Sequence, residues 1–390
     1  MTSPRRRIVV LGTMGADPYA GMAWMHMQIA GGLRRLGHDV YYLETSSFWP
    51  YDPVRGSFVC DAEYVAPYLA RVAERFGLGD RWACRRSYSD RAWLGPVASR
   101  GDALLVESDA VLNVSGATRL AEDYLTAKRL VYFGTDPVIH ELGYANGDPL
   151  ARAIVDEHEA SVTYGENIGR PDCTIPPLPR LRAHTRQPVL LDLWRTDVPP
   201  RPTWTTVGNW RQTGKDLVFK GETYYWSKHY EFQKFLDLPQ RVKPPIELAF
   251  NLAAVDGETR RMLDARGFVL ADAASFTTDP LPYHAYVSDS RGEWTVAKDQ
   301  NVRLNSGWFS ERSACYLAAG RPVITQNTGF GRTLPTGEGL FAFDTLDEIV
   351  AAFEAVEADY KHHSRAARRI AEEYFDAEKV LARLLKDLGL

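Results

Sequence analysis

The chain has 390 residues, 45% hydrophobic and 25% charged, a length that predicts two or three domains with cores of their own. Its 50 acidic against 46 basic residues give a net charge of -4, which provides no electrostatic basis for nucleic acid as the main partner. Four widely spaced cysteines, with no Cys-x-x-Cys pair, indicate neither a disulfide framework nor a cysteine zinc site. The apolar run at residues 8–11 is too short for a signal sequence or a membrane span, so we expect a cytoplasmic protein.

The start of the chain predicts a strand, a turn, a helix and a second strand. Residues 8–11 form an apolar run that Gly12 ends, and residues 40–43 form another. Between them, Gly37 stands where a left-handed C-cap occurs, after apolar residues at helical spacing, namely Met25, Ile29, Leu33 and Leu36. This βαβ order predicts a doubly wound α/β domain.

The same order continues along the chain. Residues 104–106 and 129–133 read as further strands, and the second is followed by Asp136. Ligands of open α/β sheets lie beyond the carboxyl ends of the strands, so Asp136 is a candidate catalytic residue. The alternative is a turn-forming Asp before Pro137.

A proline-rich segment separates two similar halves. Eight prolines lie between residues 171 and 202, a density that indicates a stiff linker. Residues 204–208 restart the α/β pattern, with later strands expected at 246–250, 268–270, 283–287 and 323–325. From residue 364 onward, apolar residues at helical spacing predict an amphipathic helix that docks on the rest of the protein.

Several known site types are excluded by spacing. The segment from Gly208 to Asp216 has five residues between its glycines and an Asp where a phosphate-binding P-loop has Ser or Thr. The turn at residues 12–15 lacks the Gly-x-Gly-x-x-Gly pattern, although Glu44 ends the second strand, so a nicotinamide enzyme is a weak alternative. There is no His-Glu-x-x-His and no Asp-x-Asp, which favours a metal-independent architecture.

The segment from residue 288 to 331 carries the strongest signal. Ser310 is a suitable N-cap for a helix that Gly320 closes, and a helix N-terminus favours anions. Basic residues close in sequence would add charge for a diphosphate, and they are Lys298, Arg303 and Arg312. The alternative is a solvated basic loop on a capped helix.

Neighbouring positions complete the predicted diphosphate site. A glycine turn with Thr328 and Gly329 follows a strand, where backbone can approach a ligand closely or simply turn. Glu338, between two glycines, can accept hydrogen bonds from sugar hydroxyls or merely lie on a turn. The remaining candidates in this segment are Glu293, Ser306 and Gly307. A further group lies around the turn after the first strand of the second half, where a cation would neutralise a leaving phosphate. It consists of Gly208, Asn209, Arg211 and Lys215.

The N-terminal half offers candidates for the acceptor side. Asp17 and His26 stand before and within the first helix, where a base could take the proton of an acceptor hydroxyl. A helix-capping Asp17 and a packed His26 are the structural alternatives. Gly15 and Trp24 are candidate acceptor contacts.

The order of these pieces resembles a GT-B glycosyltransferase, similar to the group 1 and spore-maturation-type enzymes. Residues 36–40, Leu-Gly-His-Asp-Val, look like the Leu-Gly-His-x-Val phrase of that family's acceptor domain. Residues 318–324 look like the Ala-x-Gly-x-Pro-Val-Ile phrase before the donor turn, and residues 309–313 are similar to the Arg-bearing variant. The resemblance implies an acceptor domain at 1–185, a linker at 186–203, a donor domain at 204–365 and a helix at 366–390 that returns to the N-terminal domain.

One departure from the family pattern concerns the donor sugar. The large retaining family carries two glutamates about eight residues apart, and here Ser306 or Gly307 and Ala314 or Cys315 stand in their places. Nearby substitutes are Glu293, Glu311 and Glu338, so the sequence does not choose between retention and inversion.

The resulting expectation is a glycosyltransferase that needs no cofactor and no metal. Its partners would be a nucleoside diphosphate sugar and a small-molecule acceptor, such as a natural product, with no nucleic acid, and the protein would be a monomer or a dimer. The alternatives are a nucleotide-sugar epimerase on the same fold and a non-catalytic sugar- or nucleotide-binding protein.

Overall fold

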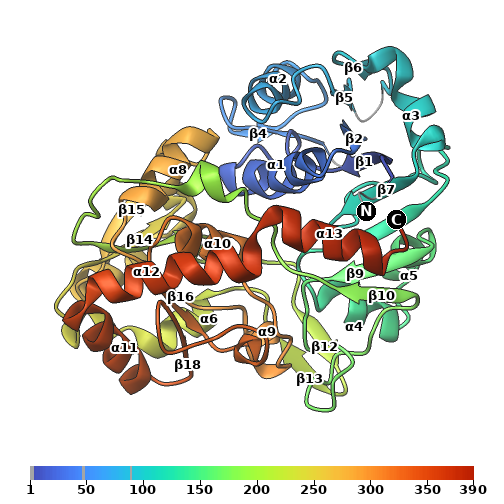
Figure 1. Ribbon diagram of the computed structural model, residues 1–390. Helices are drawn as coiled ribbons and strands as arrows, with labels where there is room; N and C mark the ends of the chain where they lie inside the picture. The colour runs from blue at the N-terminus through green and yellow to red at the C-terminus, as the bar shows by residue number, and fades with distance from the viewer. Residues whose placement is uncertain (1–3, 46–48, 88–89) are drawn as a thin grey trace.

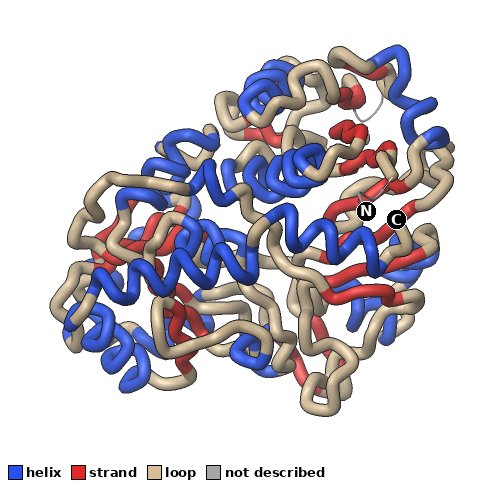
Figure 2. The backbone as a smooth tube through the Cα atoms, viewed as in Figure 1, coloured by secondary structure: helices blue, strands red, loops and turns tan. Residues whose placement is uncertain are grey.

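The computed structural model describes residues 4–45, 49–87 and 90–390 and contains two sheets, each flanked by helices (Figures 1 and 2). The first sheet has eight strands in the order β10-β9-β8-β7-β1-β2-β5-β6, all parallel except the β5–β6 pair. Its strands are β1 (Arg7–Leu11), β2 (Asp39–Glu44), β5 (Trp82–Arg85), β6 (Trp93–Leu94), β7 (Ala110–Val114), β8 (Leu130–Gly134), β9 (Ala160–Thr163) and β10 (Leu181–His184). Its helices are α1 (Ala20–Arg35), α2 (Val65–Arg75), α3 (Gly101–Glu107), α4 (Ile139–Ala145) and α5 (Pro149–Asp156), and a short hairpin joins β3 (Tyr51–Asp52) to β4 (Ser57–Phe58).

The second sheet has six parallel strands in the order β15-β14-β11-β16-β17-β18. They are β11 (Trp204–Gly208), β14 (Ile246–Phe250), β15 (Val269–Asp272), β16 (Glu293–Thr295), β17 (Val323–Gln326) and β18 (Leu340–Phe343). A hairpin of β12 (Leu217–Phe219) and β13 (Glu222–Tyr224) follows β11. The helices are α6 (His229–Phe232), α7 (Gly257–Ala265), α8 (Pro280–Asp289), α9 (Asp299–Arg303), α10 (Glu311–Ala318), α11 (Leu346–Ala358), α12 (Tyr360–Ile370) and α13 (Ala377–Asp387).

Both sheets are doubly wound, which confirms the predicted fold class. The strand order reverses between β1 and β7 in the first sheet and between β11 and β16 in the second. Such switch points open a crevice beyond the carboxyl ends of the strands, where ligands bind in this architecture. The strands that flank these two points therefore define where a site is to be sought.

Most predicted strands are confirmed, and two are wrong. Residues 104–106 lie in α3 and residues 283–287 lie in α8. A short apolar run fits a buried helix as well as a strand, so it did not distinguish the two. For α8 the helix signal was local: Asp279 accepts a hydrogen bond from the backbone N–H of Leu281 and Pro280 begins the helix.

The C-terminal helix packs back on the N-terminal domain, as predicted. In Figure 1 α12 lies along the second half, and α13 continues toward the first half beside α1. A Cβ on Gly32 of α1 would lie 2.5 Å from Leu381, so the glycine permits the close approach of the two helices. The expected single helix is divided by a π-helical turn at Ala371–Phe375 and by Asp376, whose carboxylate caps α13.

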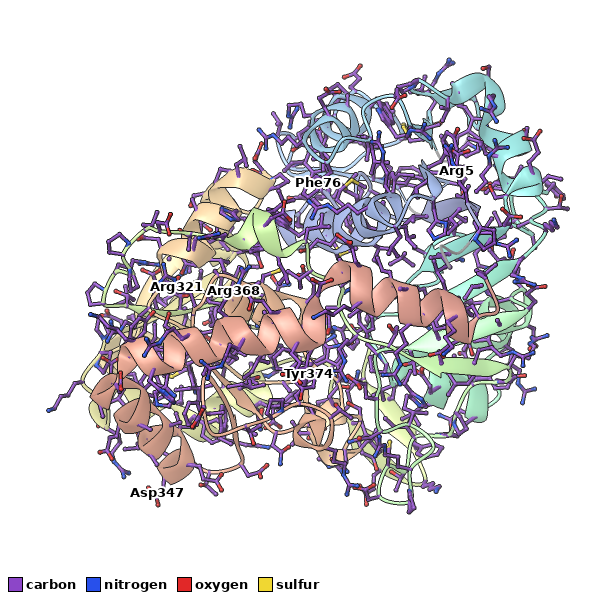
Figure 3. All side chains as sticks on the ribbon, in the orientation of Figure 1. Arg5, Phe76, Arg321, Asp347, Arg368 and Tyr374 are labelled. Atoms are coloured by element: carbon purple, nitrogen blue, oxygen red, sulfur yellow. The ribbon has the colours of Figure 1, made fainter. Side chains whose placement is uncertain are left out.

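Two arginines of the second half hold the proline-rich linker. Arg321 donates to the carbonyl of Val198 at 2.7 Å, and Arg368 donates to that of Leu191 at 3.1 Å (Figure 3). The linker is thus bonded to the domain that follows it, which fixes its course.

Candidate active site

The two switch-point crevices face one another, and an ion pair joins them. Asp136 follows β8 in the first half, and Lys298 follows β16 in the second. The Lys298 Nζ lies 2.5 Å from Asp136 Oδ2, while Asp136 Oδ1 is buried without a hydrogen-bond partner. Two predicted site residues from opposite domains are therefore in contact.

Three lysines gather on the second-domain side of this contact. The Lys298 Nζ lies 3.0 Å and the Lys215 Nζ 4.8 Å from the centre of the Trp226 ring, which gives both ammonium groups a cation–π contact. Lys228 belongs to the same group, because Lys298, Arg312 and Asp136 all act on its charge. Lys215, Lys228, Lys298 and Trp226 are called the lysine cluster below.

The lysine cluster contains more positive charge than its surroundings neutralise. Within the described part of the chain, the ammonium group of Lys228 has neither an ion pair nor a hydrogen bond. Desolvation, followed by the charges of Arg312 and Lys298, lowers its pKa well below the usual value, against the opposing effect of Glu293 and Asp136. Burial also lowers the pKa of Lys298, although Asp136 raises it. An anion entering this space would relieve the repulsion.

Asp17 and His140 face the cluster from the first domain. Asp17 is exposed on the first-domain side of this contact. Partial desolvation raises the pKa of its carboxyl group, and the charge of Lys215 lowers it. The His140 Nδ1 lies 2.5 Å from the Tyr132 hydroxyl, and burial lowers the pKa of His140 to about 4, so the ring is neutral near pH 7. A solvent-accessible carboxylate and a neutral imidazole are thus available opposite the lysines.

Backbone strain marks the loop that carries Asp136. Val138 has a φ of 102°, a conformation that a β-branched residue rarely adopts. Its N–H donates to Glu141 Oε2 at 2.8 Å, which anchors the strained residue to α4. Strain of this kind persists where the surroundings hold it in place, and it concentrates at functional loops.

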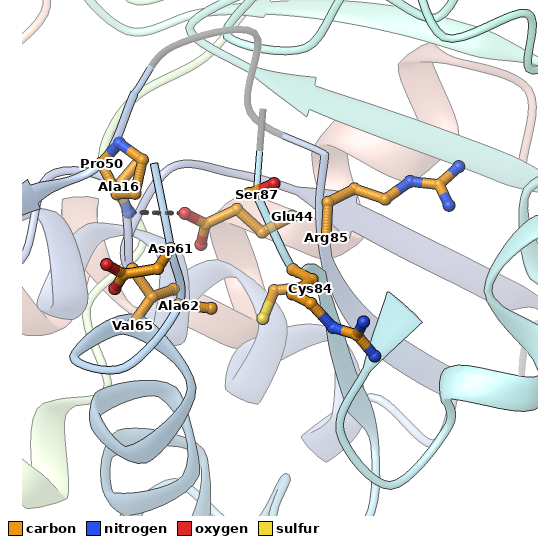
Figure 4. Close-up of a pocket in the computed structure, with 10 residues that line it drawn as sticks. Ala16, Glu44, Pro50, Asp61, Ala62, Val65, Cys84, Arg85 and Ser87 are labelled. Carbon is orange, nitrogen blue, oxygen red and sulfur yellow. Dashed lines mark hydrogen bonds between the residues drawn. The ribbon is translucent and has the colours of Figure 1, made fainter. Parts of the chain in front are cut away.

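The glycine turn after β1 is occupied by a side chain of the protein. The Ala16 N–H donates to the Glu44 carboxyl group at 2.6 Å (Figure 4). The Gly15 N–H and the Tyr42 hydroxyl also donate to it, each at 2.9 Å. The turn therefore binds a carboxyl group of the protein itself, which argues against a dinucleotide phosphate there. The cavity beside Glu44 has a volume of about 20 Å³, room for a water but not for a sugar.

His26 and Trp24 are buried, which differs from their predicted roles as a catalytic base and an acceptor contact. His26 is fully buried, its Nδ1 lies 2.7 Å from the Met22 carbonyl, and a Cβ on Gly12 would lie 2.3 Å from its ring. Trp24 is 4% exposed and donates to the Pro280 carbonyl at 3.1 Å, at the interface between α1 and α8. Neither side chain reaches an acceptor in this arrangement.

Arg312 and Glu293 form a buried ion pair beneath the crevice floor. Arg312 also donates to the Val207 carbonyl at 2.5 Å and to Thr295 Oγ1 at 3.0 Å, so each guanidinium nitrogen has a protein partner. Desolvation opposes the charged form, but the Glu293 charge prevails and raises the pKa of Arg312. The pair ties α10 to β11 and β16, and it acts on the lysine cluster through its charge.

The predicted glycine turns approach the first domain. Asn167 donates to the Gly329 carbonyl at 3.1 Å and, through its backbone N–H, to Ser306 at 3.1 Å. A Cβ on Gly307 would lie 2.7 Å from the Asn167 backbone, and the Gly307 N–H donates to Thr328 at 2.7 Å. The close approach that these glycines permit is between the two domains.

The other predicted donor residues are distributed around this centre. Gly208 is the last residue of β11, and Asn209 and Arg211 in the turn after it are exposed. Ser310 is the N-cap of α10 without a side-chain cap bond. Arg303 is paired with Glu222 of the β12–β13 hairpin, and Glu338 lies 3.3 Å from His362 of α12. The structure does not bring Arg303 or Glu338 to the lysine cluster.

Sequence reasoning did not select Lys228 or Asn167, and it did not assign Trp226 to the donor site. Trp226 and Lys228 lie after the β12–β13 hairpin, an insertion between two strands of the second sheet, and no motif marks them. The available signal was the aromatic run from Tyr224 to Trp226 followed by a lysine. Asn167 gives no signal, because its importance comes from a contact with the other domain.

The described residues contain neither a candidate metal site nor a candidate membrane span. No three His, Cys, Asp or Glu side chains among them are grouped so that they could hold a metal ion. None of the helices in the described part of the chain has both the length and the apolar character needed to cross a membrane.

The fold is shared with solved glycosyltransferases, although the sequences are far apart. No protein-family model and no curated protein sequence matches the chain. HepE of Anabaena, solved with UDP and glucose, is 12% identical, with 99% of this chain and 100% of that chain covered and a TM-score of 0.58. An alpha-glucosyltransferase solved with UDP and a 13-mer DNA is 9% identical, with both chains covered at 100% and a TM-score of 0.60. Sucrose-phosphate synthase of Thermosynechococcus elongatus is 13% identical, with 99% of both chains covered and a TM-score of 0.53. The chain therefore has the GT-B fold of these glycosyltransferases, as the resemblance in its sequence implied.

Proposed function

We propose that the protein transfers a sugar from a nucleoside diphosphate sugar to a small-molecule acceptor, without a bound metal. The observation that carries this proposal is the lysine cluster, in which Lys228 has no anionic partner within the described residues. A diphosphate supplies the missing negative charge.

The same residues account for the chemistry of the leaving group. Negative charge builds up on the departing diphosphate, and fixed cations in a partly desolvated cleft stabilise it more effectively than water does. The lysines then take the role that a divalent metal has in other transferases. In the proposed reaction a carboxylate of the first domain, Asp17 or Asp136, receives the proton of the acceptor hydroxyl.

The solved relatives of the fold support a nucleotide-sugar donor. HepE was solved with UDP and glucose, and the alpha-glucosyltransferase with UDP. Those ligands belong to those proteins, and at about a tenth identity they indicate the donor class for this chain rather than a particular sugar.

The test is calorimetric titration of the protein with UDP, GDP and dTDP in the presence of EDTA. We expect one nucleotide to bind and its sugar conjugate to be consumed when an acceptor is added. Failure of every nucleotide to bind would end the proposal, and binding only without EDTA would end its metal-independent part. Binding without turnover would favour a non-catalytic protein, and isomerisation of the sugar without acceptor would favour an epimerase.

A further inference from the structure

A row of solvent-exposed aromatic rings lies beside Asp17. Tyr19 is 39% and Phe58 is 67% exposed, and Tyr51 between them is half-buried. The rings of Tyr19 and Tyr51 are nearly parallel, with centres 6.1 Å apart, and those of Tyr51 and Phe58 are 5.6 Å apart. Tyr19, Tyr51 and Phe58 are called the aromatic shelf below.

The shelf is fixed to the turn that carries Asp17. The Tyr51 N–H donates to the Ala16 carbonyl at 2.9 Å, and Tyr51 pairs with Phe58 in the β3–β4 hairpin. Asp52 stabilises the hairpin by accepting the N–H of Val54 at 2.8 Å. The three rings belong to no hydrophobic core of the described residues, so packing does not explain their presence.

The shelf reaches the cleft at its Tyr19 end. The charge of Asp17 acts on the Tyr19 hydroxyl, and the charge of Lys215 in the other domain acts on Asp17. The Asp17 carboxylate has no hydrogen-bond partner in the part of the chain that the structure describes, which leaves it available to a ligand. An apolar surface therefore runs up to an unpaired carboxylate and then to the lysine cluster.

Building on the proposed function, we propose that the acceptor is a phenol whose ring lies on the aromatic shelf and whose hydroxyl meets Asp17. Stacking on aromatic faces favours a flat aromatic ring over a flexible chain. The phenolic oxygen forms a bond to the anomeric carbon of the donor sugar. The bond from that carbon to the diphosphate oxygen breaks with its electron pair, and the phenolic proton passes to Asp17.

The basicity of the Asp17 carboxylate favours a phenol over an aliphatic alcohol as the acceptor. Partial desolvation raises the pKa of its carboxyl, which makes it a stronger base than an ordinary Asp. A phenol of the tyrosine type has a pKa of about 10, so it gives up its proton to such a base far more readily than an aliphatic alcohol does.

The experiment uses 4-methylumbelliferone as the phenol and methyl glucoside as the non-aromatic comparison, with the nucleotide sugar that binds best. Tyr51→Leu and Phe58→Leu remove a ring but keep an apolar side chain. We expect each to raise the KM for the phenol about two- to tenfold, the effect of one aromatic contact. The donor Kd should not change. Tyr124→Leu, at a 92% exposed tyrosine outside the shelf, is the matched control and should behave as the unchanged protein.

Two outcomes would overturn the acceptor assignment while leaving the proposed function standing. One is a phenol KM that neither shelf variant alters. The other is a protein that binds the nucleotide sugar but glycosylates methyl glucoside, or does not glycosylate the phenol. If the wild-type protein bound no nucleotide sugar, that result would instead contradict the proposed function itself.

Discussion

Replacing Lys228 by Met tests the assignment of the diphosphate site directly. Lys228 lies among like charges, and it has no anionic partner in the described structure. The Met side chain keeps the aliphatic length and removes the charge. If the lysine cluster binds the diphosphate, the change should weaken nucleotide binding without damaging the fold.

The size of the effect follows from the charge-assisted bonds that an ammonium group makes to phosphate. One such bond contributes about 1.5–3 kcal/mol, so we expect the Kd for the preferred nucleotide to rise about tenfold to a hundredfold. The free energy of unfolding should not fall with nucleotide affinity, and it should instead stay the same or rise. The pKa of Lys228 is lower in the folded state than in the unfolded chain, so the unfolded chain binds more protons. The charged lysine therefore destabilises the fold below its lowered pKa, and this cost disappears as the pH rises toward about 10.

Calorimetry at pH 7 and urea unfolding at several pH values measure the two effects. Lys228→Met should unfold at the same or a higher urea concentration than the unchanged protein at pH 7, and the difference should vanish near pH 10. Lys243→Met, at an exposed lysine of the loop before β14, is the matched control. An unchanged nucleotide Kd would show that the diphosphate lies elsewhere, and a large loss of stability would show that Lys228 has a structural partner.

Three further changes separate catalysis, folding and pH response. Asp17→Asn removes the base of the proposed reaction, so kcat should fall about a hundredfold or more while the nucleotide Kd stays the same; an unchanged kcat would leave Asp136 as the base. Arg312→Met leaves Glu293 buried and unpaired and should cost about 3–5 kcal/mol of unfolding free energy, measured in urea; a selective loss of nucleotide binding at full stability would instead indicate a direct donor contact. Burial raises the pKa of Glu311 to about 7, so the folded state binds the extra proton and stability falls as the pH rises from about 4.5 through 7. Glu311→Gln should therefore raise the melting temperature at pH 8 more than at pH 5, and an equal effect at both values would contradict the assignment.

The fold could be predicted because the strands are buried and ordered along the chain. The apolar runs at residues 8–11, 40–43 and 246–250 are short and bounded by turns, and each forms a strand of a doubly wound sheet. β16 was missed because it has three residues, Glu293–Thr295, and includes a charged one. Its glutamate is buried only because Arg312 of α10 neutralises it, a pairing across 19 positions that strand periodicity does not reveal.

The candidate site was predictable only in part, because its members come from both domains. Asp136 was predicted from the rule that site residues lie beyond strand ends, and Lys298 from its closeness in sequence to a helix N-terminus; in the structure the two are in contact. The closeness of Arg303 and Arg312 in sequence was misleading. The two side chains leave their helices in different directions, one toward Glu222 of the hairpin and the other toward Glu293 in the interior. Sequence separation does not give side-chain direction when a turn lies between.

The three nearby substitutes for the paired glutamates of the retaining family are all bound to other protein groups. Of the three substitutes, Glu293 is neutralised by Arg312, and Glu338 lies against His362 on the outer helix. Glu311 accepts a hydrogen bond from Gln28 of the first domain at 2.9 Å. The carboxylates that remain at the cleft, Asp17 and Asp136, belong to the first domain, whereas the lysines belong to the second. Acid–base groups and phosphate-binding cations thus stand on separate bodies, so in the proposed reaction they act together only when the domains are closed. Closure would then protect the donor from hydrolysis, because an open protein holds the diphosphate without a base beside it.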